Sequence, residues 1–194
     1  MAKKVTNDRH VAGVVQRIYA DAQRLDWEYR SQREHTEQYA RWLAEPHVGG
    51  VLSEWMSPEE QRVWLKDGPM KEFARALAGE GPFAAYLSEH PRSPKVVVTR
   101  VLGDGWQPIA GSNDVKPLRC DASNGAQTMR VVWGPAKDFK HLLWVALEAW
   151  DASAKRSLRI AVFDTVSSPL PRQERDRLQR IAARCQVDVV FVRL

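Results

Sequence analysis

The spacing of apolar residues between Asp138 and Leu194 constrains the fold of this chain more than any other feature. Residues 138–151 carry apolar positions three and four residues apart, which is the spacing of one buried face of a helix. Residues 158–166 are apolar on both alternating faces, which is typical of a strand in the middle of a covered sheet. A second helix up to Cys185 and a β-branched strand over 187–194 follow. The segment predicts a βαβ unit with parallel strands and a right-handed crossover.

Four shorter β runs are expected before that unit, over residues 96–102, 106–110, 115–120 and 127–133. Turns rich in Gly, Asp and Asn separate them, and Asp-Gly is the dipeptide that supplies the positive φ of a hairpin turn. These runs predict a β-meander that leads into the βαβ unit.

The first 90 residues show helical patterns. One pattern runs from Asn7-Asp8 to Glu45, either as one helix or as two helices that break near Ser31, and Ser57-Pro58 and Pro69 begin two further helices. The first pattern contains a heptad seam, which either packs inside the chain or joins two copies as a homodimer. The seam consists of Val11, Val15, Ile18, Ala22, Leu25 and Tyr29.

Together these patterns predict an α+β fold, with an N-terminal helical region over 1–90 and a mixed β-sheet over 95–194 that ends in a βαβ unit. A Pro-rich linker, residues 91–94, separates the two regions, which form either two units or one compact domain. No apolar run is long enough to cross a bilayer, and the first ten residues have no apolar stretch behind their lysines, so neither a membrane nor a secretory signal is expected. Cys120 and Cys185 suit a reducing cytosol as free thiols, which predicts a cytoplasmic protein without a disulfide.

Positive charge is confined to the second half of the chain. Residues 1–94 carry 13 Lys and Arg against 14 Asp and Glu, whereas residues 95–194 carry 16 against 10. Such an asymmetry indicates an anionic partner, nucleic acid first among them. The alternative is that the charge serves solubility.

A stripe of cations in the C-terminal region is the candidate nucleic-acid-binding surface. It consists of Lys137, Lys140, Lys155, Arg156, Arg159, Arg172, Arg177, Arg180 and Arg184. Such a stripe can contact backbone phosphates without reading sequence. In the alternative, Asp176 pairs with Arg180, and the later arginines are solvated at the helix C-terminus. Trp64, Trp144 and Trp150 lie in helical segments and are expected in a core or interface rather than as base-stacking platforms.

Asp104 and the triplet Asp114-Val115-Lys116 form a second candidate site. An acid followed by acid-x-Lys on adjoining strands can hold Mg²⁺ and polarise a water. With the order of helix, antiparallel strands, helix and strand, this arrangement resembles restriction-endonuclease-like nucleases. The resemblance implies that Asp104, Asp114 and Lys116 are catalytic and that Mg²⁺ is the cofactor. In the alternative, both acids serve only the turns in which they lie.

Asp164, Thr165, Ser167 and Ser168 follow the doubly apolar strand and form a third candidate, an anion site. Ligands of open α/β sheets bind at the carboxyl ends of strands, and the next helix N-terminus favours anions. The alternative is that Asp164 and Ser167 cap the turn and the following helix.

The recognised phosphate-loop, dinucleotide, metalloprotease, Cys-x-x-Cys and nucleophile-elbow motifs are missing, and the five histidines are scattered, so no zinc site built from His and Cys is expected. The favoured hypothesis is therefore a non-catalytic, prokaryotic-type accessory protein that binds nucleic acid through its basic half. The alternatives are a Mg²⁺-dependent nuclease and a protein-interaction or inhibitor subunit.

Overall fold

The chain divides into two compact units, Met1–His90 and Pro91–Leu194. The structure, a computed structural model, describes residues 9–151, 157–165 and 169–193. The first unit contains one hydrophobic core cluster and the second unit contains two. Within the described ranges no helix is long and apolar enough to cross a membrane.

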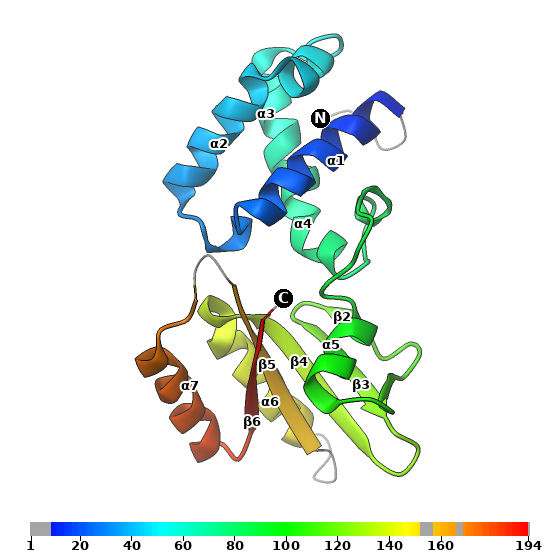
Figure 1. Cartoon of the computed structure of the whole chain (residues 1–194), viewed down its shortest axis with the longest axis vertical. Coiled ribbons are helices and arrows are strands. Elements are labelled where there is room, and N and C mark those ends of the chain that lie inside the picture. The colour runs from blue at the N-terminus through cyan, green and yellow to red at the C-terminus, as the bar shows by residue number, and fades with distance from the viewer. Residues whose placement is uncertain (1–8, 152–156, 166–168, 194) are drawn as a thin grey trace. The chain divides into compact units, whose positions relative to one another are not determined.

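The first unit is helical (Figure 1). Its main helices are α1 (Arg9–Arg24), α2 (Gln32–Ala44), α3 (Pro58–Asp67) and α4 (Pro69–Leu77), and its short helical segments are η1 (Trp27–Tyr29), η2 (Pro46–Gly50) and η3 (Ala84–Tyr86). Ser57 caps α3 with a capping box and Pro58 occupies its first turn, as the sequence predicts. The large side chains Tyr19, Trp42 and Leu65 are fully buried at the centre.

The long N-terminal pattern forms two helices rather than one. Asp26 adopts a left-handed conformation, with φ 50° and ψ 53°, and this ends the regular geometry after α1. Ser31 then starts α2 with a capping box: the Glu34 amide donates to the Ser31 hydroxyl at 3.3 Å, and the Ser31 amide donates to the Glu34 carboxylate at 2.7 Å. The chain therefore breaks near Ser31, as the two-helix alternative predicts.

Four of the six residues of the heptad seam are buried inside the first unit, whereas Leu25 and Tyr29 are half-buried. Val11, Val15, Ile18 and Ala22 have no exposed surface, and all four belong to the core of that unit. The contacts of the seam are thus made within the chain, which is the first of its two predicted uses.

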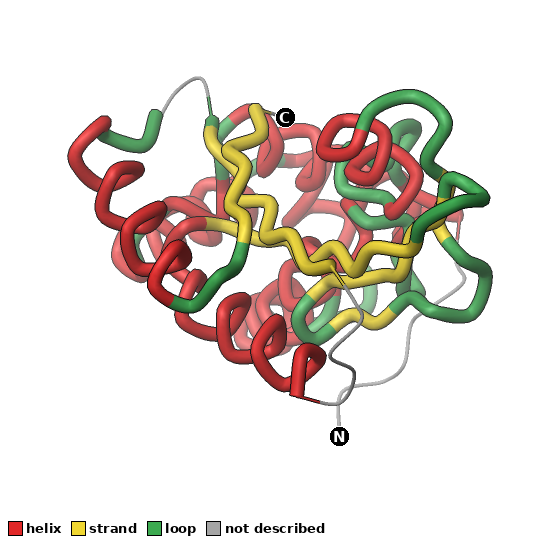
Figure 2. The backbone as a smooth tube through the Cα atoms, turned by 90° about the horizontal axis from the view of Figure 1, so that it is seen from below, coloured by secondary structure: helices red, strands yellow, loops and turns green. Residues whose placement is uncertain are grey.

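The second unit is a six-stranded mixed sheet with helices on both faces. Its strands, yellow in Figure 2, are ordered β1-β3-β4-β5-β6, with β2 paired to β3. The ranges are β1 (Gln107–Pro108), β2 (Asp114–Val115), β3 (Leu118–Ser123), β4 (Thr128–Pro135), β5 (Ser157–Asp164) and β6 (Asp188–Arg193). The helices are α5 (Pro94–Leu102), α6 (Phe139–Asp151) and α7 (Arg172–Arg184), with a 3₁₀ turn, η4 (Ala136–Asp138), before α6.

The α+β class and the parallel C-terminal strands are confirmed. β5 pairs in parallel with both β4 and β6, so the doubly apolar strand is central. Its Ile160 and Val162 face the core beneath α6 and α7, whereas Ala161 and Phe163 face the core beneath α5. One strand thus supplies both layers because its alternate side chains point to opposite faces.

The expected strand over 96–102 is wrong, because this segment is helix α5. Ser93 occupies the N-cap position, Pro94 the first turn, and Gly103 with φ 89° the C-cap. Val97, Val98 and Val101 are buried on one helical face against the sheet. Packing of this face overrides the strand preference of β-branched residues.

The expected strand over 115–120 is divided in two. Val115 ends β2 and Leu118 begins β3, and the two residues pair across a tight turn made by Lys116-Pro117, a cis peptide. Pro117, which has no N–H for a ladder, occupies the turn. This turn is additional to the predicted one around Gly111, where the Ser112 amide donates to the Ile109 carbonyl at 3.2 Å between β1 and β2.

The two cysteines differ in burial, and their reactivity is expected to differ accordingly. Cys120 is fully buried, and burial, with a further contribution from the Asp121 carboxylate, raises the pKa of its thiol to about 12. Cys185 is half-buried, and both thiols are free. Because the thiolate is the nucleophile, iodoacetamide at pH 8 should alkylate Cys185 in the folded protein and Cys120 only after unfolding. Peptide mass spectrometry reads both sites, and equal native labelling would contradict this prediction.

Candidate nucleic-acid interface

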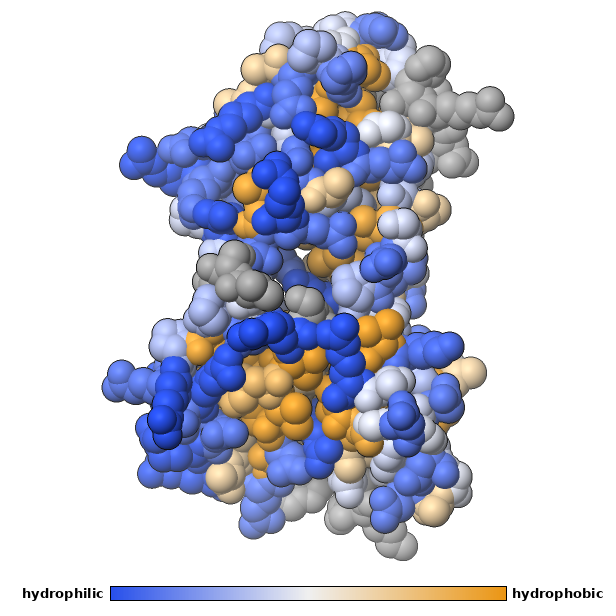
Figure 3. All heavy atoms as spheres, in the orientation of Figure 1, coloured by the Kyte–Doolittle hydropathy of each residue, from blue (hydrophilic) through white to orange (hydrophobic). Residues whose placement is uncertain are grey.

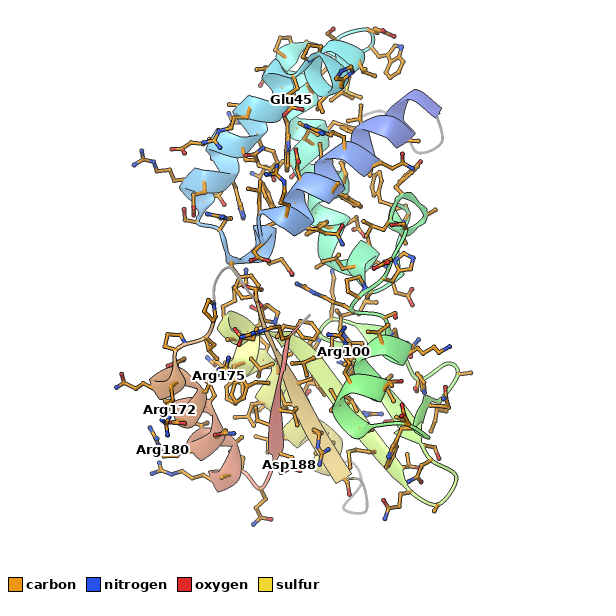
Figure 4. The ribbon with its side chains drawn as sticks, viewed as in Figure 1. Glu45, Arg100, Arg172, Arg175, Arg180 and Asp188 are labelled. Carbon is orange, nitrogen blue, oxygen red and sulfur yellow. The ribbon has the colours of Figure 1, made fainter. Side chains whose placement is uncertain are left out.

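The described cations of the predicted stripe that have no acidic partner lie on α7 and at the start of α6. Lys140, Arg172, Arg180 and Arg184 are exposed, and none of these four makes an ion pair within the described ranges. In Figure 4, Arg172 and Arg180 extend away from α7 on the side opposite the sheet. Asp176 forms no ion pair with Arg180 in this part of the chain, so the expected pairing of these two residues is not observed.

Other cations of the sheet-bearing unit are held by carboxylates. Arg177 donates to Glu174 at 2.9 Å, although its side chain stays 60% exposed. Arg159 donates to Asp188 at 2.9 Å across the β5–β6 pair and also to the Val101 carbonyl. Arg177 therefore keeps access to a ligand, whereas Arg159 faces the α5 side of the sheet and does not belong to the stripe.

Arg130 is also unavailable to an external ligand. Its guanidinium donates to both carboxylate oxygens of Asp121, at 2.7 and 3.0 Å. This hydrogen-bonded pairing raises the pKa of Arg130, with the burial of the group acting in the opposite direction. The bidentate pair joins β3 to β4 and is a structural contact.

A groove separates the start of α6 from α7, with a volume of about 310 Å³. Three cations of the predicted stripe, Lys137, Lys140 and Arg177, line it. Its remaining lining is mainly apolar and consists of Ala136, Phe139, Leu143, Leu178 and Ile181. An apolar floor beneath three cationic groups can accommodate a planar or aliphatic group that is attached to an anion.

We use the name α6–α7 face for the three cations that line this groove together with the three other exposed arginines of α7: Lys137, Lys140, Arg177, Arg172, Arg180 and Arg184. In Figure 3 the flank formed by α7 is hydrophilic, while apolar residues show over the neighbouring strands. Two acids also lie on α7, Glu174 beside Arg177 and the exposed Asp176. Lys155 and Arg156 of the predicted stripe lie outside the described residues.

Asp164 is part of a buried ion pair. Its side chain is 3% exposed, and its carboxylate accepts hydrogen bonds from the Leu170 amide at 2.7 Å and from the Arg175 guanidinium. Arg175 also donates to the Leu170 carbonyl, and its guanidinium carbon lies over the Phe191 ring, 5.4 Å from the ring centroid. Thr165 is buried, and Ser167 and Ser168 lie outside the described residues. The carboxylate therefore holds the chain that enters α7, but it does not cap the helix itself, because the N-cap residue Pro171 has no side-chain cap hydrogen bond.

The residues of the predicted nuclease site serve local contacts. Asp104 is exposed in the turn after α5. The Asp114 carboxylate accepts hydrogen bonds from the Arg119 guanidinium at 2.5 Å and from the Val115 amide at 2.7 Å. Lys116 lies in the turn between β2 and β3. Within the described ranges no three or more His, Cys, Asp or Glu side chains form a group that could hold a metal ion.

Two features of residues on α6 and α7, outside the six cations of the α6–α7 face, are absent from the sequence-based prediction. Arg175 stands in the same helix as the stripe, but its contact with Asp164 joins residues that are 11 positions apart, one in α7 and the other at the end of β5. Trp144 was expected in a core or interface, yet its side chain is 62% exposed. Helical spacing from Lys140, four residues earlier, is the signal that places this indole on the same side as the cations.

Comparison of the chain with protein-family models, with curated proteins and with solved structures gave no significant match.

Proposed function

We propose that the sheet-bearing unit is a non-catalytic module that binds nucleic acid by its sugar-phosphate backbone, so that the protein serves as an accessory factor on nucleic acid. The supporting observation is the gathering of Lys140, Arg172, Arg180 and Arg184 on the α6–α7 face without acidic partners in the described ranges. Cations without partners release condensed counterions when they neutralise phosphates, and this release drives nonspecific binding.

The division of the chain supports the same proposal. With Arg92 in the second unit, residues 91–194 carry 17 Lys and Arg against 10 Asp and Glu, while residues 1–90 carry 12 against 14. An approaching polyanion is therefore attracted to the sheet-bearing unit and not to the helical unit.

The proposal is tested by fluorescence anisotropy with labelled duplex and single strands over a salt series. The wild type should bind with an affinity that falls linearly with salt on logarithmic axes. The variant Lys140→Gln/Arg180→Gln/Arg184→Gln should reduce the slope by about 2–3 and weaken binding about tenfold or more at physiological salt, because three phosphate contacts are lost.

Three exposed cations of the helical unit supply the matched control. The variant Arg41→Gln/Arg62→Gln/Lys71→Gln removes the same charge from the first unit and should leave slope and affinity nearly unchanged. Absent or salt-independent binding by the wild type would refute the proposal, as would an equal loss in both triple variants.

A further inference from the structure

Trp144 is the most exposed large apolar side chain among the described residues. It is 62% exposed, against 43% for Trp55 and Val63 and 39% for Ile109. The other face of α6 is buried normally, with Leu142 and Ala146 in the core. The position of Trp144 is therefore not required for packing within this unit.

One edge of the indole is fixed. The Trp144 Nε1–H donates to the Glu148 carboxylate at 2.7 Å, one helical turn later. This hydrogen bond uses the edge of the ring and leaves its π faces available for contact. A side chain that is held in this way loses little conformational freedom when a flat ligand stacks on it.

The surroundings of Trp144 indicate the chemistry of such a ligand. Lys140 lies one turn before Trp144 on the same side of α6 and also lines the groove with Lys137 and Arg177. An aromatic face beside cations matches a nucleotide whose base is unstacked, since the base offers a π face and its phosphates are anionic. A duplex keeps these base faces inside its stack, so only a single strand can use both features.

We infer that the α6–α7 face takes a single strand, with a base stacked on Trp144 and the adjoining phosphates at Lys140 and Arg177. The apolar groove beside Lys140 then receives the edge of a neighbouring base or sugar. This inference rests on the proposed function and adds to it the form of the nucleic acid and the residue that discriminates between forms.

The test compares Trp144→Ala with Trp55→Ala, which removes an exposed indole from the helical unit. Anisotropy is measured with a labelled strand of about 20 nucleotides, which exceeds the roughly 4–16 nucleotides that one single-strand-binding domain covers, and with its duplex at the same salt. Trp144→Ala should weaken binding of the strand about tenfold and binding of the duplex less than about twofold. Its salt slope should stay that of the wild type because the indole carries no charge.

Three further measurements keep the test specific. Trp144→Phe preserves a π face and should bind the strand within about threefold of the wild type. Saturation with an unlabelled strand should quench the intrinsic fluorescence of the wild type and of Trp55→Ala more than that of Trp144→Ala. An unchanged unfolding midpoint of Trp144→Ala confirms that the variants differ in binding and not in folding.

The outcomes separate the inference from the proposed function. If the wild type binds neither strand nor duplex, both are overturned. If it binds both and Trp144→Ala has no effect, or weakens both equally, only the single-strand inference fails. If Trp144→Ala converts a dimer of the free protein into a monomer in sedimentation, the indole is covered by a second copy and the inference fails as well.

Discussion

Replacing Gly49 by alanine should destabilise the helical unit by about 3 kcal/mol or more, whereas the same change at Gly50 should be nearly neutral. Gly49 lies in η2, directly after α2, and its backbone lies against α2. A Cβ at this position would be 1.8 Å from the Leu43 carbonyl oxygen and 2.6 Å from the carbonyl carbon. The obstacle is backbone, which cannot rotate away as a side chain can, so the substitution must displace η2 or the end of α2.

Gly50 is the matched control because it is the next residue in the same turn. A Cβ there would have the Pro46 Cβ at 3.9 Å as its nearest neighbour, which is an ordinary contact. Alanine also restricts the unfolded chain more than glycine, which offsets small losses. Chemical denaturation followed by circular dichroism should give a lower midpoint for Gly49→Ala alone. Coincident midpoints for the two variants would contradict the close approach of η2 to α2.

Replacing Asp164 by alanine should destabilise the sheet-bearing unit by about 2–3 kcal/mol, below the range of about 3–5 kcal/mol for a fully buried ion pair. We expect a smaller loss of stability than for a fully buried pair because the Arg175 side chain is 34% exposed, whereas that of Asp164 is 3% exposed. The variant leaves the Arg175 guanidinium and the Leu170 amide without the carboxylate that holds them. These contacts hold the segment that leads into α7. The variant therefore tests whether Asp164 stabilises the position of the helix that carries most of the α6–α7 face.

Asp188→Ala is the control for this prediction. Asp188 forms a comparable pair with Arg159 at 2.9 Å, but its side chain is 71% exposed. A pair of this kind is screened by water, so its loss should cost less than about 1 kcal/mol. Denaturant midpoints of the two variants provide the comparison. Equal destabilisation would show that burial does not distinguish the two carboxylates.

The sequence predicted those parts of the fold for which the local pattern of one strand or helix is sufficient evidence. β5 is apolar on both faces and is therefore central, and α3 begins at its capping box. α5 was not predictable in this way, because its valines favour a strand and Gly103 suits a hairpin turn as well as a helix C-cap. The burial of Val97, Val98 and Val101 against the sheet decides between the two, and this contact is not local in sequence.

The cations of the α6–α7 face were predictable as a helical stripe, but their partners were not. Arg159 meets Asp188, 29 residues later, because β5 and β6 are neighbours in the sheet. The groove likewise needs Lys140 and Arg177 from two separate helices. Spacing along one helix therefore identifies which cations share a side and also the local pair of Arg177 with Glu174, whereas only the tertiary structure identifies a carboxylate partner on another element, such as Asp188.

Helix α5 carries a conflict between local preference and tertiary structure. Its sequence, PKVVVTRVL, is rich in residues that favour extended chains, and it is helical because Val97, Val98 and Val101 are packed on the sheet. Once that packing is lost, the same valines are free to pair with identical segments of other molecules. We therefore expect aggregation of this protein to begin from partly unfolded molecules that have released α5, with Lys95 and Arg100 as the charges that oppose it.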